Sequence, residues 1–393
     1  MASYSGSWHG EYWSDSSDES DTLQLGSMEE CQEPQPKQPK RFRLTHKQAC
    51  PHIPRPVKQR RSDVRAGLIG VSGKTYRRML KFGLPSFFFG ILMAMQLGGM
   101  IPVAGLSLVE YYGGVRAIQR AYAAKGHAAA AFDKAYHGDQ DFNSDIGFMG
   151  ALLLALRTRE GEAFSWFATV CATWVWMCRA STKRSAQNPL GDTSSHCVML
   201  ANEQVVRMCL IIRFLLAKSV DWALEQPASS IMDCHPRMQA LKNMCLQLMA
   251  QRAGTHAGWH RVHIFMKAYG APTPKPTKVW SNSKRILALK KRVKKGNLTT
   301  DAGCETTARV RLQDGTVQVN GIGKCLKKSQ EYTDEFGEAV YDTMYAKKHA
   351  DNNKDGESDD ESIDEDTLTD LWEDAHLQGV CRSLGVPHDR MPF

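Results

Sequence analysis

The chain has 393 residues, of which 42% are hydrophobic and 23% are charged, and its formal net charge is +8. This balance leaves enough apolar material for a buried core, so it excludes a chain that is disordered from end to end. The positive charge comes from two basic clusters set against acidic runs, so local electric fields matter more than the sum.

The two ends of the chain are too polar to fold alone, which leaves one sizeable domain in the middle. Residues 1–62 are rich in Ser, Asp, Glu, Gln, Pro and Lys, and we expect them to be disordered. We also expect the acidic tail at 346–393 to be largely disordered. The basic clusters lie between Lys40 and Arg65 and between Lys284 and Lys295, where they suit nucleic-acid phosphates, a nuclear address or a solvated linker.

Cysteine usage and the polar start of the chain indicate the compartment. The eleven cysteines form no Cys-x-x-Cys pair, and the first thirty residues do not read as a signal peptide. We therefore expect an intracellular protein, nuclear rather than cytoplasmic, with no disulfide framework and no metal site.

Residues 63–104 are expected to form an apolar helical lead-in. The stretch from Leu84 to Val109 carries no charged side chain and is long enough for a membrane-spanning helix. Pro85, the Gly98-Gly99 pair and Pro102 interrupt it, which favours a buried helix over Phe87 to Gln96, then a break and a strand. Membrane association stays open as the less favoured alternative.

Residues 105–283 alternate short apolar runs with helical patterns, which predicts an α/β domain with a doubly wound, mostly parallel sheet of Rossmann-like type. The expected strands are Gly105 to Glu110, His127 to Asp133, Ala163 to Cys171, Val220 to Glu225 and Val262 to Tyr269. The expected helices are Val115 to Lys125, Phe148 to Arg157 and Val198 to Lys218. Residues 284–345 then supply a basic segment, a hairpin within Val310 to Val319 and a C-terminal helix.

Residues that follow the strands deserve the most weight, because parallel sheets bind ligands at the carboxyl ends of their strands. The first strand runs into Tyr112-Gly113-Gly114, a turn that lets a ligand approach the backbone at the start of a helix. The second strand closes on Asp133, a carboxylate suited to ribose hydroxyls. Asp141 or Asp145 follows, either as a partner for an adenine amino group or as a helix cap.

This order of strand, Tyr-Gly-Gly, helix, strand and Asp resembles the cofactor half of a class I S-adenosylmethionine-dependent methyltransferase. The Gly-x-Gly-x-x-Gly pattern of nicotinamide enzymes is absent. Within that superfamily, the segment from Leu106 to Asn282 is most similar to the C5-cytosine DNA methyltransferase family. The resemblance implies S-adenosylmethionine as cofactor, DNA rather than RNA as partner, and a cofactor site made of Glu110, Tyr112, Gly113, Gly114, Asp133 and Asp145.

The same resemblance supplies catalytic and substrate residues. Cys171 stands where the family has the thiolate that attacks C6 of cytosine, although a small buried apolar residue is the alternative interpretation. Glu225 matches the glutamate that contacts the base, or else is a structural anchor. Lys275-Pro276-Thr277 matches a run that precedes a final strand, or is a rigid turn. The implied substrate-binding residues are Arg179, Lys275 and Lys278.

Several departures from the family pattern favour a second hypothesis. Thr169 and Val170 replace two prolines, and Gln226 stands where asparagine is usual. The large target-recognition domain of sequence-specific members is missing, and the closing Gln-Ile-Gly-Asn element is not evident, with residues Ser329 to Gly337 in its place. The alternative function is a catalytically inactive methyltransferase-like fold that acts as a nucleic-acid-binding or interaction module.

Overall fold

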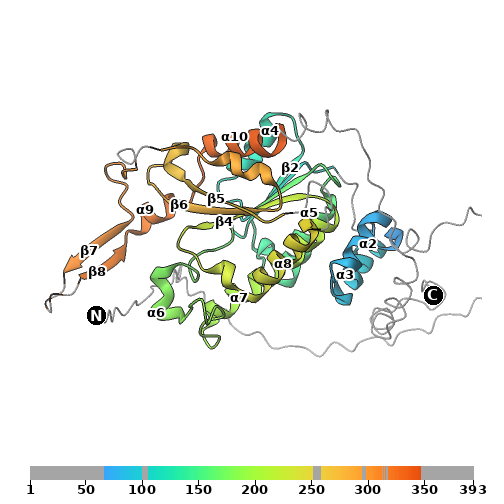
Figure 1. Ribbon diagram of the computed structural model, residues 1–393, viewed down its shortest axis with the longest axis horizontal. Helices are drawn as coiled ribbons and strands as arrows, with labels where there is room; N and C mark the ends of the chain where they lie inside the picture. Colours follow the sequence, from blue (N-terminus) through green and yellow to red (C-terminus); the bar gives the residue numbers. More distant parts are fainter. Residues whose placement is uncertain are drawn as a thin grey trace, which may run out of the picture. The chain divides into compact units, whose positions relative to one another are not determined.

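The computed structural model describes residues 66–99, 105–250, 258–293 and 298–346, apart from 312, 314 and 316. The predictions made for 1–62 and for the tail beyond Ala346 lie outside these ranges. Within them the chain folds around a mixed, mostly parallel six-stranded sheet with helices on both faces (Figure 1). The predicted α/β fold class is therefore confirmed.

The sheet has the strand order β2-β1-β3-β4-β6-β5. Strands β1 to β4 are parallel, whereas β6 is antiparallel to both β4 and β5. All five predicted strands are present with shifted bounds, and β6 is the final strand that the Lys-Pro-Thr run implied. The bounds are β1 Leu108–Tyr111, β2 Ala129–Phe132, β3 Phe164–Phe167, β4 Asp221–Pro227, β5 His260–Phe265 and β6 Pro276–Ser281.

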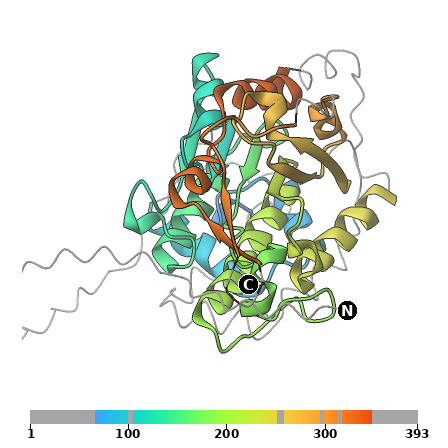
Figure 2. The same ribbon diagram turned by 90° about the vertical axis from the view of Figure 1, so that its left-hand side faces the viewer.

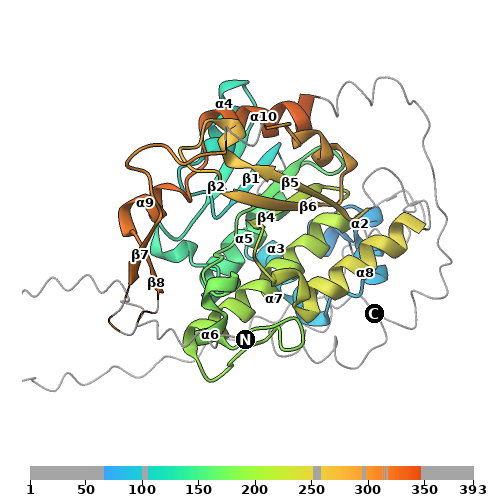
Figure 3. The same cartoon turned by 60° about the vertical axis from the view of Figure 1, so that its left-hand side comes forward.

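Two layers of helices cover the sheet because its strands carry apolar side chains on both faces. On β1, Leu108 belongs to the core on the side of α4 and α10, and Val109 to the core on the side of α5, α7 and α8. α10 lies beside α4 in each view (Figure 1, Figure 2 and Figure 3). The bounds are α4 Ala117–Ala124, α5 Asp145–Arg157, α7 His196–Ala217, α8 Pro236–Ala250 and α10 Asp334–Tyr341.

The apolar lead-in forms two helices, α2 (Gly73–Lys81) and α3 (Ser86–Leu97), so the helix predicted over Phe87 to Gln96 is present. α2 packs against α7, and the Phe88 ring of α3 lies 5.6 Å from that of Phe214. The lead-in thereby extends the larger core. Among the helices of the described ranges, none combines the length and the apolar character that crossing a membrane would require.

The predicted hairpin is present as a separate antiparallel ribbon, β7 (Thr307–Arg311) and β8 (Val317–Gly321), which projects from the body of the fold (Figure 3). Val310 pairs with Gln318 in its register. The ribbon leads through α9 (Gly323–Lys328) into α10, and so returns the chain to the sheet.

Gly337 allows α10 to lie directly on α4. A Cβ atom at this position would stand 2.8 Å from the carbonyl carbon of Ala117, which belongs to the backbone and has little room to move. We expect Gly337→Ala to lower the free energy of unfolding by about 1–3 kcal/mol, because the two helices must separate. Urea unfolding measures the change, and Gly105→Ala, where a Cβ meets nothing within 4 Å, is the control. Equal losses in both variants would contradict this packing.

Candidate functional site

The topology makes the carboxyl ends of β1 and β3 the expected place for a ligand. β1 lies between β2 and β3, and the chain passes from β2 across β1 to β3, so strand order reverses at this point. Doubly wound sheets bind their ligands outside the strand ends at such a reversal. The glycine turn, Asp133, Cys171 and Glu225 all follow or end strands at this edge of the sheet.

The turn after β1 has an unusual backbone. Tyr112 has φ 59° and Gly114 has φ 49°, both in the left-handed region. A Cβ at Gly113 would stand 2.7 Å from the Tyr136 hydroxyl, so this glycine is required by packing inside the protein. A Cβ at Gly114 would meet nothing within 4 Å. Gly114 is therefore the position where a ligand can approach the backbone.

Asp133 holds the turn after β1 to the turn after β2. Its Oδ2 accepts the Gly114 N–H at 2.9 Å, and its Oδ1 accepts the Ala135 N–H at 2.8 Å. The side chain is half-buried, and each carboxylate oxygen keeps a second lone pair. The structure thus brings Asp133 to the glycine turn, as the sequence predicted, and fixes its orientation.

Asp141 and Asp145, the two aspartates proposed as adenine partners or helix caps, form ion pairs with basic side chains instead. Ser144 caps α5, because its hydroxyl accepts the Gly147 N–H at 2.9 Å. Asp145 is the first residue of the helix; its side chain is 92% exposed and pairs with Arg207 at 2.8 Å. Asp141 pairs with Lys134 at 3.1 Å. Neither aspartate provides the side-chain cap.

Glu110 lies beneath the start of α4 and is completely buried. Its Oε2 accepts the Gln119 N–H at 2.8 Å, so it satisfies a first-turn donor of a helix whose own N-cap, Arg116, offers no side-chain bond. Oε1 has no hydrogen-bond partner. Burial raises the pKa of Glu110 to about 7, against the opposing effect of the helix N–H groups.

Cys171 lies four residues beyond β3 rather than at its end. Its loop is hydrogen-bonded to β4, through Thr169 and Gln226. Burial is the main reason that the pKa of its thiol rises to about 11; the charge of Glu225 raises it further, and that of Lys275 lowers it. The structure therefore brings Cys171, Glu225 and Lys275 close enough for their charges to interact. The thiol is therefore neutral at pH 7, because a thiolate forms in quantity only where the pH approaches the pKa.

Gln226 and Thr169 contact each other. The Gln226 side-chain amide donates to the Thr169 carbonyl at 2.7 Å and to the Thr169 hydroxyl at 3.1 Å. Gln226 is fully buried at the end of β4, next to Glu225. These two bonds hold the loop that carries Cys171 against β4.

Glu225 and Lys275 form an ion pair at the junction of β4 and β6. Lys275 Nζ lies 3.6 Å from Glu225 Oε1, and their side chains are 18% and 6% exposed. Lys275 has φ 30°, a strained conformation for a residue with a side chain. Such strain persists where the surrounding contacts fix it, which makes Lys275 a precisely placed cation.

The other two predicted substrate residues lie elsewhere. Lys278 is buried; its amine donates to the Ser230 carbonyl and lies 3.5 Å from Asp233. Because Lys278 pairs with Gln226 in the sheet, it emerges on the face opposite Glu225. Arg179 is exposed on the short helix α6 (Arg179–Thr182), where its charge acts on Cys234.

Sequence reasoning missed Tyr332, which enters the site from the segment before α10. Its hydroxyl accepts the Trp166 indole N–H at 3.3 Å, and burial, followed by the charge of Glu225, raises its pKa. The Lys275 amine lies 5.5 Å from the centre of its ring. No usable signal for it was present in the sequence, because Ser329 to Gly337 stands only in the place of a closing family element that is itself not evident.

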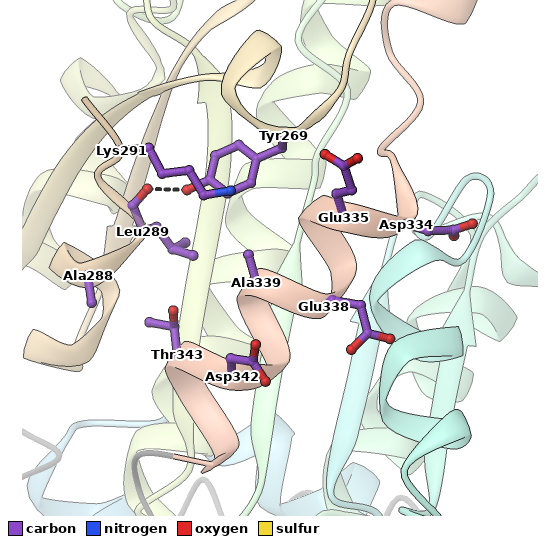
Figure 4. A pocket seen from close by; sticks show the side chains of 10 residues that line it. All are labelled: Tyr269, Ala288, Leu289, Lys291, Asp334, Glu335, Glu338, Ala339, Asp342 and Thr343. Carbon is purple, nitrogen blue, oxygen red and sulfur yellow. Dashed lines mark hydrogen bonds between the residues drawn. The ribbon is translucent and has the colours of Figure 1, made fainter. Parts of the chain in front are cut away.

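A cleft of about 630 Å³ lies along α10, outside this group of residues (Figure 4). Its floor includes Tyr269, whose hydroxyl donates to the Leu289 carbonyl, and α10 contributes a row of acidic side chains. Neither Cys171 nor Glu225 lines it. An acidic wall of this kind repels phosphates and other anions.

In the part of the chain that the structure describes, no three His, Cys, Asp or Glu side chains gather in an arrangement able to hold a metal ion. Comparison with known proteins gives no match, neither to a family model nor to a curated protein.

Proposed function

We propose that this chain is an S-adenosylmethionine-dependent methyltransferase that acts on cytosine in nucleic acid, with DNA preferred to RNA. The observation that carries the proposal is the 3.6 Å ion pair of Glu225 and Lys275 at the carboxyl edge of the sheet, where chemistry is expected. Cys171, in the loop after the neighbouring strand β3, is near enough for both charges to act on its thiol. A thiol and a carboxylate are the groups that the proposed covalent mechanism requires.

The residues around Gly114 fit the cofactor. Gly114 leaves open space above its backbone, and Asp133 is anchored beside it with free lone pairs for ribose hydroxyls. The Tyr112 hydroxyl is buried without a hydrogen-bond partner in the same turn, and the charges of Asp141 and Asp133 act on it. When bound, S-adenosylmethionine supplies an electrophilic methyl group.

The roles of the chain's own residues follow from their chemistry. The Cys171 thiol gives up its proton to water, its sulfur forms a bond to C6 of cytosine, and the electron pair of the C5–C6 double bond makes C5 nucleophilic. Glu225 hydrogen-bonds N3 and the exocyclic amine of the base. After C5 has accepted the methyl group, with S-adenosylhomocysteine as the leaving group, water takes the C5 proton and the sulfur–C6 bond breaks, which restores the aromatic ring and the cysteine thiolate.

Methyl transfer is tested directly with the purified full-length chain and radiolabelled S-adenosylmethionine. We expect label to enter cytosine-containing DNA more readily than RNA of the same sequence, and not DNA that lacks cytosine. Label on protein alone, or none, would reject the proposal.

Asp133→Ala tests the cofactor site separately. We expect it to weaken S-adenosylmethionine binding about tenfold, because two hydrogen bonds to the cofactor are lost at the cost of roughly 1 kcal/mol or more. Calorimetry measures the dissociation constant. The control is Asp139→Ala, which removes an exposed carboxylate near His137. Equal affinity in the wild type and Asp133→Ala would place the cofactor elsewhere.

The second candidate function is a binding module without catalysis. The pKa of about 11 for the Cys171 thiol favours it, because a buried neutral thiol is a poor nucleophile. On this hypothesis the chain binds nucleic acid, and neither Cys171 nor Glu225 changes the affinity when substituted. Binding without label transfer, at equal affinity in both variants, would support this second function.

A further inference from the structure

We propose that a cavity between the starts of α7 and α8 binds a small organic acid, which has an apolar body and one carboxylate. The cavity has a volume of about 460 Å³, and its lining comes from the loop before α7, the first half of α7 and the start of α8. α8 packs against α7 (Figure 3). Neither Cys171 nor Glu225 lines this cavity, so the proposal is independent of methyl transfer.

The walls of the cavity are mostly apolar and partly uncovered. Leu190, Met199 and Val206 line it from the side of α7, and Pro236 lines it from the side of α8. Leu190 is 39% exposed and Met199 is 45% exposed. A ligand with an apolar body gains free energy by covering such walls, and cavities for small ligands typically measure about 300–1,000 Å³.

His235 supplies a buried donor that has no acceptor in the described part of the chain. It lines the cavity and is 2% exposed. Its Nδ1 accepts the Arg237 N–H at 3.2 Å, whereas Nε2, on the other edge of the ring, has no hydrogen-bond partner among the described residues. Burial first, then the charges of Arg184 and Arg237, lower the pKa of His235 to about 4, so the ring is neutral at pH 7. Because Nδ1 accepts, Nε2 carries the proton.

The start of α8 makes this end of the cavity positive. The first turn of α8 contains no acidic residue, and the N–H groups of a helix start carry a partial positive charge. The exposed side chain of Arg237 adds a full charge. Glu203 is the single carboxylate in the lining, and it pairs with Arg207 at 2.6 Å. Asp233, just before His235, lies 3.5 Å from Lys278. An anion is therefore favoured at this end.

These features together select the class of ligand. A carboxylate can accept the His235 Nε2–H and face the guanidinium of Arg237, a pairing that suits planar carboxylates. The rest of the ligand then covers Met199 and its apolar neighbours. Inorganic phosphate lacks the apolar body, and an alcohol with the same chain lacks the charge.

Octanoate is the probe, because it joins one carboxylate to an apolar chain. The purified full-length chain, labelled with ¹³C at the methionine methyl groups, is titrated by NMR, and Met199→Leu identifies the signal of Met199. We expect octanoate to shift that signal until the site is saturated, and octanol to bind about tenfold more weakly. We expect no shift with inorganic phosphate. An unchanged signal with octanoate, equal affinity for octanol, or saturation by phosphate would each overturn the proposal.

Two substitutions each remove one contact of the carboxylate. We expect Arg237→Ala and His235→Phe to raise the Kd for octanoate about tenfold and to leave the Kd for octanol unchanged. Arg237→Lys keeps the charge and should restore most of the affinity. The control is Lys242→Ala, which removes a cation from the same helix about 140° around its axis from Arg237 and should bind octanoate as the wild type does.

Arg237→Ala decides the outcome if His235→Phe does not fold, because Arg237 is exposed whereas His235 is buried. Equal Kd for octanoate in Arg237→Ala and the wild type would overturn the proposal. A saturable shift in a chain that transfers no methyl group supports the cavity site and counts against the proposed function alone.

Discussion

Cys171→Ala is expected to abolish methyl transfer to cytosine, with a loss of about 10³-fold or more. Without a sulfur atom to add at C6, the ring carbon at C5 is not nucleophilic enough to accept a methyl group. Single-turnover labelling of DNA measures the rate. The control is Cys178→Ala, which makes the same change seven residues further along, at the end of the short helix Trp176–Cys178, and should keep most of the activity.

The pH dependence of the wild-type rate is a second test of the covalent mechanism through Cys171. With the pKa of the Cys171 thiol raised to about 11, by burial first and by Glu225 second, only about one site in ten thousand carries a thiolate at pH 7. The thiolate fraction grows about tenfold per pH unit below the pKa, so we expect kcat/KM to rise steadily between pH 6.5 and pH 9.5. Label transfer that survives Cys171→Ala would reject the covalent mechanism.

The strands and the glycine turn were predictable because their signals are local. β1 to β5 stand out as short apolar runs, and β1 runs into Tyr112-Gly113-Gly114. Asp133 was predictable for the same reason, since the end of β2 delivers it to the turn after β1. The sheet topology then brings together groups that sequence alone could only propose separately.

The errors arose where tertiary contacts decide. β3 ends at Phe167, where its pairing with Leu224 stops, so Cys171 belongs to a loop and not to the predicted strand. Ser144 was not predicted as the cap of α5, because Ser and Asp compete as neighbours and only the backbone geometry selects one. Tyr332 was invisible because its partner Trp166 is 166 residues away in sequence.

Glu110→Gln is expected to remove a pH dependence of stability worth roughly 3 kcal/mol, the free energy that corresponds to a rise in pKa from 4.5 to about 7. The folded chain binds a proton at Glu110 that the unfolded chain has already lost between these pH values. The stabilisation is complete below pH 4.5 and disappears as the pH rises through 7. Glutamine keeps an acceptor for the Gln119 N–H and cannot ionise.

Urea unfolding of the wild type and Glu110→Gln from pH 4.5 to pH 8.5 measures the effect. We expect the variant to gain stability relative to the wild type across this range, with most of the change occurring below pH 7. Glu338→Gln removes a half-exposed partner of Lys125, and its free energy of unfolding should change with pH as that of the wild type does. If the free energy of unfolding of Glu110→Gln also followed the wild type at every pH, Glu110 would be ionised in the folded chain. Its burial beneath the first turn of α4 would then be offset by the N–H groups of that helix, which already lower its pKa.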